Sequence, residues 1–404
     1  MKRAAGVVLS LFLLAASSAH ARALRTQADD APAVEPAPGQ LAPSALPSDD
    51  IGTGVFYALP GDAAVASFRA HAQNIGVIAP QSFSLDAHGL LRGTLPAGLA
   101  AIARQQGVAI MPLVINAGFS RWGAERLLRS PSARDHAIGA LVDQARALEV
   151  AGWQIDFEGM HSIDRAAFSR FVADAAAALH RHGKLLSVAV AARTDDDPSS
   201  DNFRTFSGVY DYTALAHSAD FLSIMAYPES DARHPGPLAS YPWVEQVVQH
   251  VLQEAPSDKI SLGLPTYQSD WMERRTRVSV RERIRGKIRR VYRYVYRLLH
   301  HNGPVTVAPA ALRWDPVLKA AYRITGSGHS LHITWVEDQR SFDAKLRLVA
   351  QYHLRGYSVW RIGLESPGIW NQLPAAARNL TPAPPPVISA PALALPALDV
   401  TDQP

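Results

Sequence analysis

Gly152-Trp-Gln-Ile-Asp-Phe-Glu-Gly159 is a run of alternating apolar and polar residues, and this period of two is typical of a β-strand. The polar residues of the run share one face: Gln154, Asp156 and Glu158. Acidic side chains on the inner face of an apolar strand are costly to bury unless they are paired or perform chemistry. We therefore predict a buried strand with Asp156 and Glu158 side by side at its carboxyl end. The alternative is an edge strand whose polar face meets water.

Strands and helices alternate along the rest of the chain. Short apolar runs predict eight strands: Thr53–Ala58, Ile75–Pro80, Val108–Asn116, Gly152–Glu158, Leu185–Ala191, Asp220–Tyr227, Ile260–Pro265 and Tyr357–Ile362. Apolar spacings of three and four between them predict helices such as Arg134–Leu148, Ile163–His182, Trp243–Glu254 and Asp343–Tyr352. This alternation indicates an α/β fold with a parallel sheet, and eight strands favour a (β/α)8 TIM barrel. Catalytic residues of such barrels lie at the carboxyl ends of the strands.

The connection between the seventh and eighth predicted strands is too long for a single crossover. It holds residues of about 272–340, including a strand-like His329–Val336, and we predict an inserted subdomain there. The folded region is expected to cover residues 51–380. The Pro/Ala-rich residues 22–50 read as a disordered linker, and the Pro-rich residues 381–404 as a disordered tail.

The first 21 residues have the layout of a signal peptide. Lys2 and Arg3 precede an apolar stretch, and Ala19-His20-Ala21 supplies a cleavage pattern of small residues. The apolar stretch is short for a membrane span, although an uncleaved anchor is the alternative. We expect an exported, periplasmic or secreted bacterial protein.

Composition excludes several chemistries. The chain has no cysteine, which rules out disulfides, thiolate metal sites and thiol nucleophiles. Its fifteen histidines show no metal-ligand spacing, so neither a metal nor another cofactor is expected.

Positive charge is concentrated in one segment. Between Glu273 and Arg297 lie eleven Lys/Arg and two Glu, a local charge of +9 in a chain of +4. Loss of the signal peptide with Lys2 and Arg3 would leave +2, and therefore −7 outside this segment. The protein is then a mildly acidic body with one basic element, which argues against a nucleic-acid binder.

The basic segment Arg274–Leu299 also has a pattern of apolar residues. They recur at spacings of four and three: Ile284, Ile288, Val291, Val295 and Leu298. This predicts a helix with a dense arginine face. We expect Arg274–Arg297 to contact an anionic glycan or lipid headgroups. The alternative is a solvated helix packed on the acidic body.

Four motifs in order resemble glycoside hydrolase family 18, the chitinase-type barrels. They are Ala151-Gly-Trp-Gln-Ile-Asp-Phe-Glu158, Met225-Ala-Tyr227, Gly263-Leu-Pro-Thr-Tyr267 and Trp360-Arg-Ile-Gly-Leu-Glu365. The chain looks closest to the bacterial branch of spore-peptidoglycan hydrolases and domains fused to polysaccharide deacetylases. It departs from the family pattern where Ala151 and Gln154 replace acids and Pro228 replaces the Asp after Met-x-Tyr. Glu229 is a candidate for the space of that missing Asp.

The resemblance implies a substrate-assisted, retaining mechanism in which the substrate's own 2-acetamido group is the nucleophile. Glu158 would be the general acid/base, and Asp156 would bind the acetamido N–H. Tyr227 would bind the acetamido carbonyl. Gln154 could hydrogen-bond Asp156 but could not take a proton. The further substrate-binding residues would be Met225, Tyr267 and Trp360, and Trp360 would lie under the sugar ring.

The resemblance thus implies a secreted, monomeric glycosidase acting on β-linked N-acetylglucosamine polymers. Chitin, peptidoglycan and poly-N-acetylglucosamine all remain candidates. The alternatives are a catalytically weak, lectin-like protein and an accessory factor for envelope or exopolysaccharide assembly on the same barrel. Retention of Glu158 favours the enzyme, whereas Gln154 and Pro228 favour the first alternative.

Overall fold

The computed structural model describes residues 51–231, 235–284, 287–326 and 331–376. The predicted signal peptide, linker and tail therefore lie outside the described residues. No helix within the described part of the chain is long and apolar enough to span a membrane.

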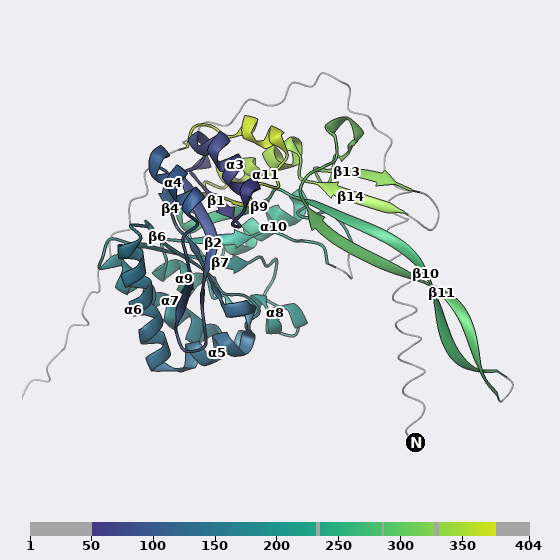
Figure 1. Ribbon diagram of the computed structural model, residues 1–404, viewed down its shortest axis with the longest axis horizontal. Coiled ribbons are helices and arrows are strands. Elements are labelled where there is room, and N and C mark those ends of the chain that lie inside the picture. The colour runs from purple at the N-terminus through teal and green to yellow at the C-terminus, as the bar shows by residue number, and fades with distance from the viewer. Residues whose placement is uncertain (1–50, 232–234, 285–286, 327–330, 377–404) are drawn as a thin grey trace, which may run out of the picture.

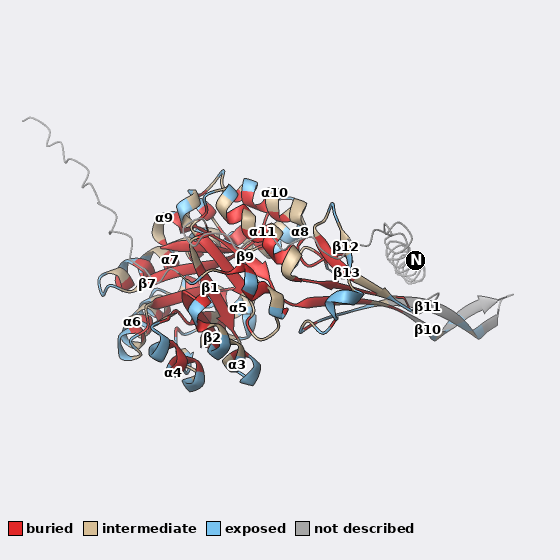
Figure 2. Ribbon diagram, turned by 90° about the horizontal axis from the view of Figure 1, so that it is seen from above, coloured by how far each residue is buried: buried red, intermediate tan, exposed pale blue. Residues whose placement is uncertain are grey.

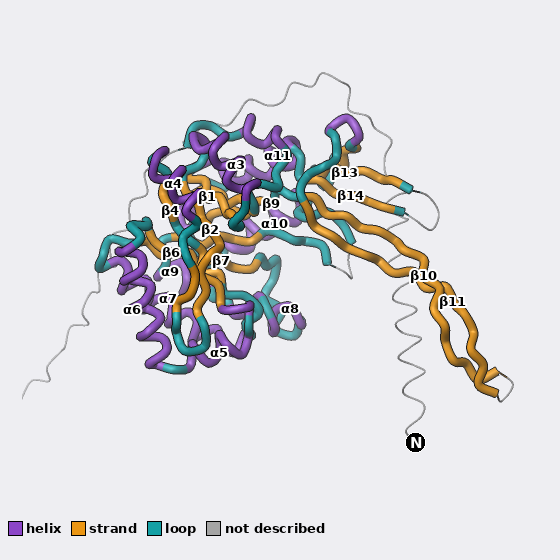
Figure 3. The backbone as a smooth tube through the Cα atoms, viewed as in Figure 1, coloured by secondary structure: helices purple, strands orange, loops and turns teal. Residues whose placement is uncertain are grey.

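Eight parallel strands form a closed barrel (Figure 1 and Figure 3). They are β1 (Thr53–Ala58), β2 (Val77–Leu85), β5 (Leu113–Asn116), β6 (Gly152–Asp156), β7 (Leu185–Ala191), β8 (Phe221–Met225), β9 (Ile260–Pro265) and β15 (Gly356–Trp360). The barrel closes because β1 pairs in parallel with both β15 and β2. Two short strands also pair with β2: β3 (Leu91–Gly93) is antiparallel to it and β4 (Ala109–Ile110) is parallel. The predicted (β/α)8 barrel is confirmed.

Helices surround the barrel and leave the strands buried between them (Figure 2). They are α3 (Asp62–His71), α4 (Ala97–Gln106), α5 (Arg121–Arg129), α6 (Pro131–Ala147), α7 (Arg165–His180), α8 (Asp201–Thr205), α9 (Tyr212–Ser218), α10 (Tyr241–Val251) and α11 (Gln339–Gln351). Local sequence sets several helix starts. Ser130, for example, accepts a hydrogen bond from the Ala133 N–H and so caps α6. The four helices named from the sequence are all present.

Strand β6 lies in the barrel wall between β5 and β7, so the edge-strand alternative is wrong. Gly152 is required at its start because a Cβ there would lie 2.0 Å from the Leu185 carbonyl oxygen. Trp153 points outward, and its Nε1 donates to the Leu141 carbonyl of α6 at 2.8 Å. The alternation predicted from the sequence therefore places Gln154 and Asp156 inside the barrel, where both are buried.

The inserted subdomain follows β9 and precedes β15, the seventh and eighth barrel strands, as predicted. It is a five-stranded sheet in the order β11-β10-β14-β13-β12. Its strands are β10 (Gln268–Ile284), β11 (Lys287–Gly303), β12 (Arg313–Asp315), β13 (Ala320–Thr325) and β14 (His332–Val336).

The helix predicted for residues 274–299 is wrong, because this segment forms the antiparallel hairpin of β10 and β11. β14 pairs with β10 only from Gln268 to Met272. Beyond Met272, β10 continues to pair with β11, and these two strands project from the barrel (Figure 1). We call residues 273–284 and 287–298 the arm. Its valines and tyrosines favour strands, and Tyr292, Tyr294 and Tyr296 recur every second residue, a strand period that competes with the helical spacing.

A buried ion pair connects the inserted sheet to the barrel. Lys345 of α11 donates from Nζ to Glu337 Oε2 at 2.6 Å and to the Ala239 carbonyl at 2.9 Å. Glu337 directly follows β14, and Ala239 lies between β8 and α10. Both charged side chains are almost fully buried. Burial raises the pKa of Glu337, and the Lys345 ammonium opposes that rise.

We predict that Lys345→Met lowers the free energy of unfolding by about 3–5 kcal/mol, because it leaves Glu337 buried without its countercharge. Urea denaturation would measure the loss. Lys345→Met combined with Glu337→Leu should recover part of it. Arg92→Ala, which breaks an exposed pair with Asp86, is the control and should cost less than about 1 kcal/mol. Equal losses for the Lys345 and Arg92 variants would contradict the prediction.

Candidate active site

A pocket opens at the carboxyl ends of the barrel strands. It encloses about 190 Å³, more than ten times the space that one water molecule needs, so it can hold a ligand group. Its lining comes from seven of the eight barrel strands or the residues that follow them: Tyr57, Leu113, Asp156, Glu158, Ala189, Met225, Tyr227, Pro228, Tyr267 and Trp360. Six of the seven site residues predicted from the sequence are therefore brought together. The seventh, Gln154, lies below the pocket.

Glu158 is positioned through its backbone. The Asn116 side chain accepts a hydrogen bond from the Glu158 N–H and donates one to the Glu158 carbonyl, both at 3.0 Å. Asn116 is itself buried at the end of β5. This reciprocal pair fixes the point from which the half-buried Glu158 carboxyl enters the pocket.

Asp156 is buried at the pocket floor, where Gln81 Nε2 donates to its Oδ2 at 3.4 Å. Its other oxygen, Oδ1, has no hydrogen-bond partner among the described residues. Burial, and secondarily the neighbouring Glu158, raise the pKa of Asp156 to about 7. Burial also raises the pKa of Glu158. The two carboxyls therefore do not both ionise easily near neutral pH.

Gln154 does not make the hydrogen bond to Asp156 that the sequence allowed. Its Nε2 instead donates to the Tyr57 hydroxyl at 2.6 Å. From Tyr57 a chain of buried hydroxyls crosses the barrel interior with successive distances of 2.6 Å, through Ser223, Ser358 and Ser261. Gln154 thus supports the floor of the pocket as part of a polar network and is not in its lining.

The three aromatic residues predicted for the site form walls of the pocket: Tyr227, Tyr267 and Trp360. Tyr227 follows β8, and burial holds the pKa of its hydroxyl well above the usual value, so it remains a hydrogen-bond donor. Burial likewise raises the pKa of Tyr267. Trp360 ends β15, with its ring centroid 5.6 Å from that of Tyr57. Met225, the last residue of β8, completes this part of the lining.

Glu229, the candidate for the space of the missing Asp, lies elsewhere. Its carboxylate accepts hydrogen bonds from the Ser240 N–H at 2.6 Å and the Ser240 hydroxyl at 3.0 Å at the start of α10.

Tyr57 and Gln81 belong to the site, but the sequence analysis did not single them out. Tyr57 is near the end of β1 and Gln81 lies in β2, at the same edge of the barrel as Glu158. Polar groups near the carboxyl ends of predicted strands were the available signal. That signal locates the edge of the barrel where the site lies, but it does not show which side chains contact each other there.

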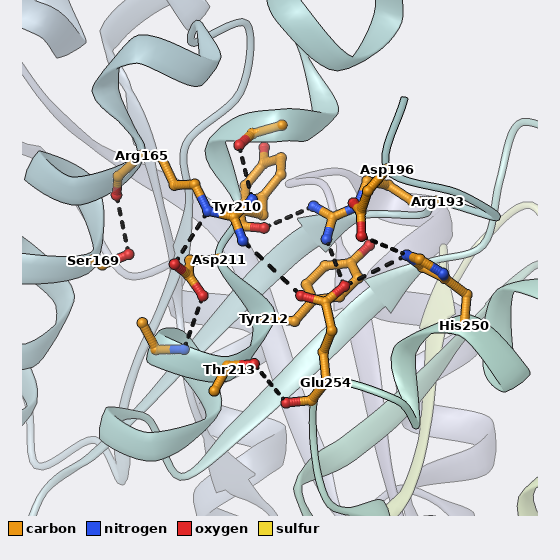
Figure 4. Close-up of polar contacts among 12 residues, drawn as sticks. Arg165, Ser169, Arg193, Asp196, Tyr210, Asp211, Tyr212, Thr213, His250 and Glu254 are labelled. Carbon is orange, nitrogen blue, oxygen red and sulfur yellow. Dashed lines mark hydrogen bonds and ion pairs between the residues drawn. The ribbon is translucent and has the colours of Figure 1, made fainter. Parts of the chain in front are cut away.

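A second polar cluster lies outside the pocket lining (Figure 4). Asp196, His250 and Glu254 could each offer a metal-ligand atom within 4.8 Å of the others. The Arg193 guanidinium, however, lies 2.8 Å from Asp196 and 2.9 Å from Glu254, and it covers the Tyr212 ring at 3.9 Å. Arginine thus supplies the positive charge, and the cluster joins the segment after β7 to the end of α10.

Comparison with known proteins agrees with this geometry. Residues 98–365 match Glycosyl hydrolases family 18. The chain is 25% identical over 329 residues to the glycosylase YvbX of Bacillus subtilis, covering 80% of this chain and 90% of the relative. It is 27% identical over 298 residues to the cortical fragment-lytic enzyme of the same organism, covering 72% and 65%.

Solved structures share the fold. A chitinase from Chromobacterium violaceum superposes with a TM-score of 0.65 at 25% identity, covering 80% of this chain and 97% of that one. The spore cortex-lytic enzyme SleL of Bacillus megaterium also gives 0.65, at 21% identity, covering 83% and 74%. The family match spans about two thirds of the chain and includes the pocket carboxyls. The chain therefore belongs to glycosyl hydrolases family 18 and is a glycoside hydrolase.

Proposed function

We propose that this protein hydrolyses β-linked N-acetylglucosamine-containing polysaccharide of the chitin or peptidoglycan type. The observation that carries the proposal is the pair of Asp156 and Glu158, both with raised pKa, in the pocket at the end of β6. The names of the relatives, a cortical fragment-lytic enzyme and a chitinase, agree with such glycans. We further propose that the protein is exported and acts as a monomer.

Glu158 is the general acid/base of the proposed reaction. Its raised pKa favours a protonated carboxyl that can donate to the leaving glycosidic oxygen. The 2-acetamido oxygen attacks the anomeric carbon as that bond breaks, which gives a cyclic oxazolinium-like intermediate. The Glu158 carboxylate then takes a proton from the water that opens the ring, so the configuration is retained.

Asp156 orients the internal nucleophile. Its Oδ1, which has no partner within the described part of the chain, can accept a hydrogen bond from the acetamido N–H and stabilise the positive charge that develops there. The Tyr227 hydroxyl would donate to the acetamido carbonyl. Trp360 offers an aromatic face for the sugar ring. Because Gln154 binds Tyr57, the described groups that influence the charge of Asp156 are chiefly Glu158 and Gln81.

A lectin-like protein of weak activity is the second candidate. Gln154 favours it, because an amide cannot take the proton that an acid at this position could share with Asp156. An accessory role in envelope or exopolysaccharide assembly is a variant of this candidate. Turnover assays on defined oligosaccharides separate both from the enzyme.

We predict that Glu158→Gln lowers turnover by about 10²–10⁴-fold or more, because the amide cannot donate the proton to the leaving group. Ligand affinity should stay within a few-fold, since the side chain keeps its shape. Steady-state kinetics and calorimetry on the same N-acetylglucosamine oligosaccharide measure the two quantities. The exposed Glu149→Gln is the control. Near-wild-type turnover of Glu158→Gln would refute the assignment.

Substrate assistance predicts a dependence on the acetamido group. Thiazoline analogues of the intermediate should inhibit, and fully deacetylated glucosamine polymers should not be cleaved. Asp156→Asn and Tyr227→Phe should each reduce kcat more than they change KM, because both residues orient the reacting group. Rapid hydrolysis of a substrate that lacks the acetamido group at the reacting sugar would exclude this mechanism.

Burial of Asp156 predicts a pH-dependent stability. Its pKa is about 7 in the folded protein against an ordinary 3.8, so the folded state binds a proton that the unfolded state has lost between these values. Stability should therefore fall as the pH rises from about 4 to about 7. Asp156→Asn removes this loss and should be more stable than wild type by about 2–4 kcal/mol at pH 8.

Denaturant unfolding at several pH values measures this difference between Asp156→Asn and wild type. The difference should shrink towards zero near pH 4. The control is Asp135→Asn, which removes an exposed carboxylate and should change stability by less than about 0.5 kcal/mol. An Asp156→Asn variant whose relative stability does not change with pH would show that Asp156 is not protonated in the folded protein.

A further inference from the structure

The arm is a two-stranded ribbon whose first strand, β10, starts beside the pocket and reaches the arm at Glu273. Tyr267 lines the pocket, and β10 starts at the next residue. From the pair Glu273–Leu298 to the pair Ile284–Lys287 the strands pair with each other in unbroken register. Twelve such pairs extend for roughly 40 Å. Figure 1 and Figure 2 both show the ribbon projecting away from the barrel.

Positive charges face each other across this ribbon. Arg281 lies directly opposite Arg290, and both side chains are exposed. The register also places position 274 opposite position 297, and both are arginines. Like charges in opposed positions destabilise a strand pair, and an isolated hairpin is only marginally stable in water. A chain that keeps these arginines together is therefore suited to a negatively charged ligand.

The described part of the chain does not neutralise these charges. Four arm arginines have described side chains, and none of them forms an ion pair with a described carboxylate: Arg277, Arg281, Arg289 and Arg290. All four are exposed. The acidic body of the protein does not cover this part of the arm.

Arginine and tyrosine share one face of the ribbon. The Arg277 guanidinium lies 4.1 Å from the centroid of the Tyr292 ring, and this ring is 55% exposed. Strand alternation places Arg281 and Arg290 on the same face, and Arg289 on the other. We call the face of Arg277, Arg281, Arg290 and Tyr292 the Arg/Tyr face.

We infer that the Arg/Tyr face binds a carboxylate-bearing strand of the glycan substrate. This deepens the proposed function and rests on it. Exposed tyrosine rings pack against the C–H faces of sugars, and guanidinium groups pair with carboxylates. β10 connects this face to Tyr267 in the pocket lining, so a glycan strand that extends from the arm along β10 would lead towards the pocket.

Charge separates the candidate polymers. Chitin is neutral and offers no partner to eleven Lys/Arg in 25 residues. A partly deacetylated poly-N-acetylglucosamine is cationic and would be repelled. A peptidoglycan-type strand carries carboxylates along its length and is attracted. A lipid surface fits less well, because Arg289 puts charge on the face opposite Arg290, so neither face is purely apolar.

The test uses the full chain with the Glu158→Gln background for binding. The arm variant is Arg277→Gln/Arg281→Gln/Arg290→Gln, and the matched control removes three exposed arginines from helix ends, Arg69→Gln/Arg146→Gln/Arg181→Gln. The ligands are soluble uncrosslinked peptidoglycan strands, the same strands with amidated carboxylates, and chitin oligosaccharides of equal length. Calorimetry gives each Kd.

The Glu158→Gln parent and the control variant should bind the free-carboxylate strands with tenfold or greater preference over the amidated ones. The triple arm variant should lose most of that preference, since exposed charge pairs each contribute modestly but add. The preference should also fall with salt because exposed charges are screened within about 8–10 Å. Arg290→Gln should weaken binding more than Arg289→Gln, its neighbour on the opposite face. Unfolding of the arm variant is not expected, because removing Arg281 and Arg290 relieves repulsion, and circular dichroism checks this.

Two results would overturn the inference. One is an arm variant that keeps the wild-type preference. The other is an arm variant that loses binding to anionic lipid vesicles while its glycan binding is unchanged. Failure of the proposed function looks different: the wild-type protein, with Glu158 intact, would hydrolyse none of the polymers, while the preference for free carboxylates and its loss in the arm variant would persist.

Discussion

The site depends on placing two carboxyl groups together inside a barrel whose other buried polar groups, such as Gln154 and Ser223, are neutral. Asp156 is buried and Glu158 half-buried, and neither is matched by a nearby described cation. Water would stabilise both as anions, but the pocket does not, so their pKa values rise. Because of these raised pKa values, one of the two groups can keep a proton near neutral pH and donate it in the reaction. The reaction that we propose follows from it.

The scaffold holds this unfavourable pair with neutral hydrogen bonds. Asn116 fixes the Glu158 backbone from the next strand, and Gln81 donates to Asp156. Beneath them, Gln154 and Tyr57 continue into the buried serine hydroxyls. Neutral donors satisfy buried oxygens without adding a countercharge that would lower the pKa of the carboxyls. Replacement of an acid by Gln154 is consistent with this arrangement.

The inserted sheet brings a different kind of electrostatics. Where it meets the barrel, charge is buried and paired, as in Lys345 with Glu337. On the arm, charge is exposed and repeated, as in Arg281 opposite Arg290. The first arrangement fastens the sheet to the barrel. The second leaves exposed positive charges that an anionic ligand can neutralise. One insertion therefore combines a rigid attachment to the barrel with an exposed binding surface.

The sequence determined the barrel and most of the pocket, because both follow from local patterns. Alternation in residues 152–158 fixed which side chains face inward, and the order of strands fixed the edge where Asp156, Tyr227 and Trp360 meet. It also located the insertion and its charge. It did not decide the conformation of the arm, since residues 274–299 carry helical and strand periodicities together.

Tertiary structure decided what depends on partners far apart in the chain. The arm is a hairpin because β10 continues a strand already paired with β14, which propagates the extended backbone. Gln154 binds Tyr57 instead of Asp156, and Gln81 takes the place beside Asp156, because strand register sets these distances. Periodicity shows the face on which a side chain lies. Only the closed barrel determines which side chain it meets there.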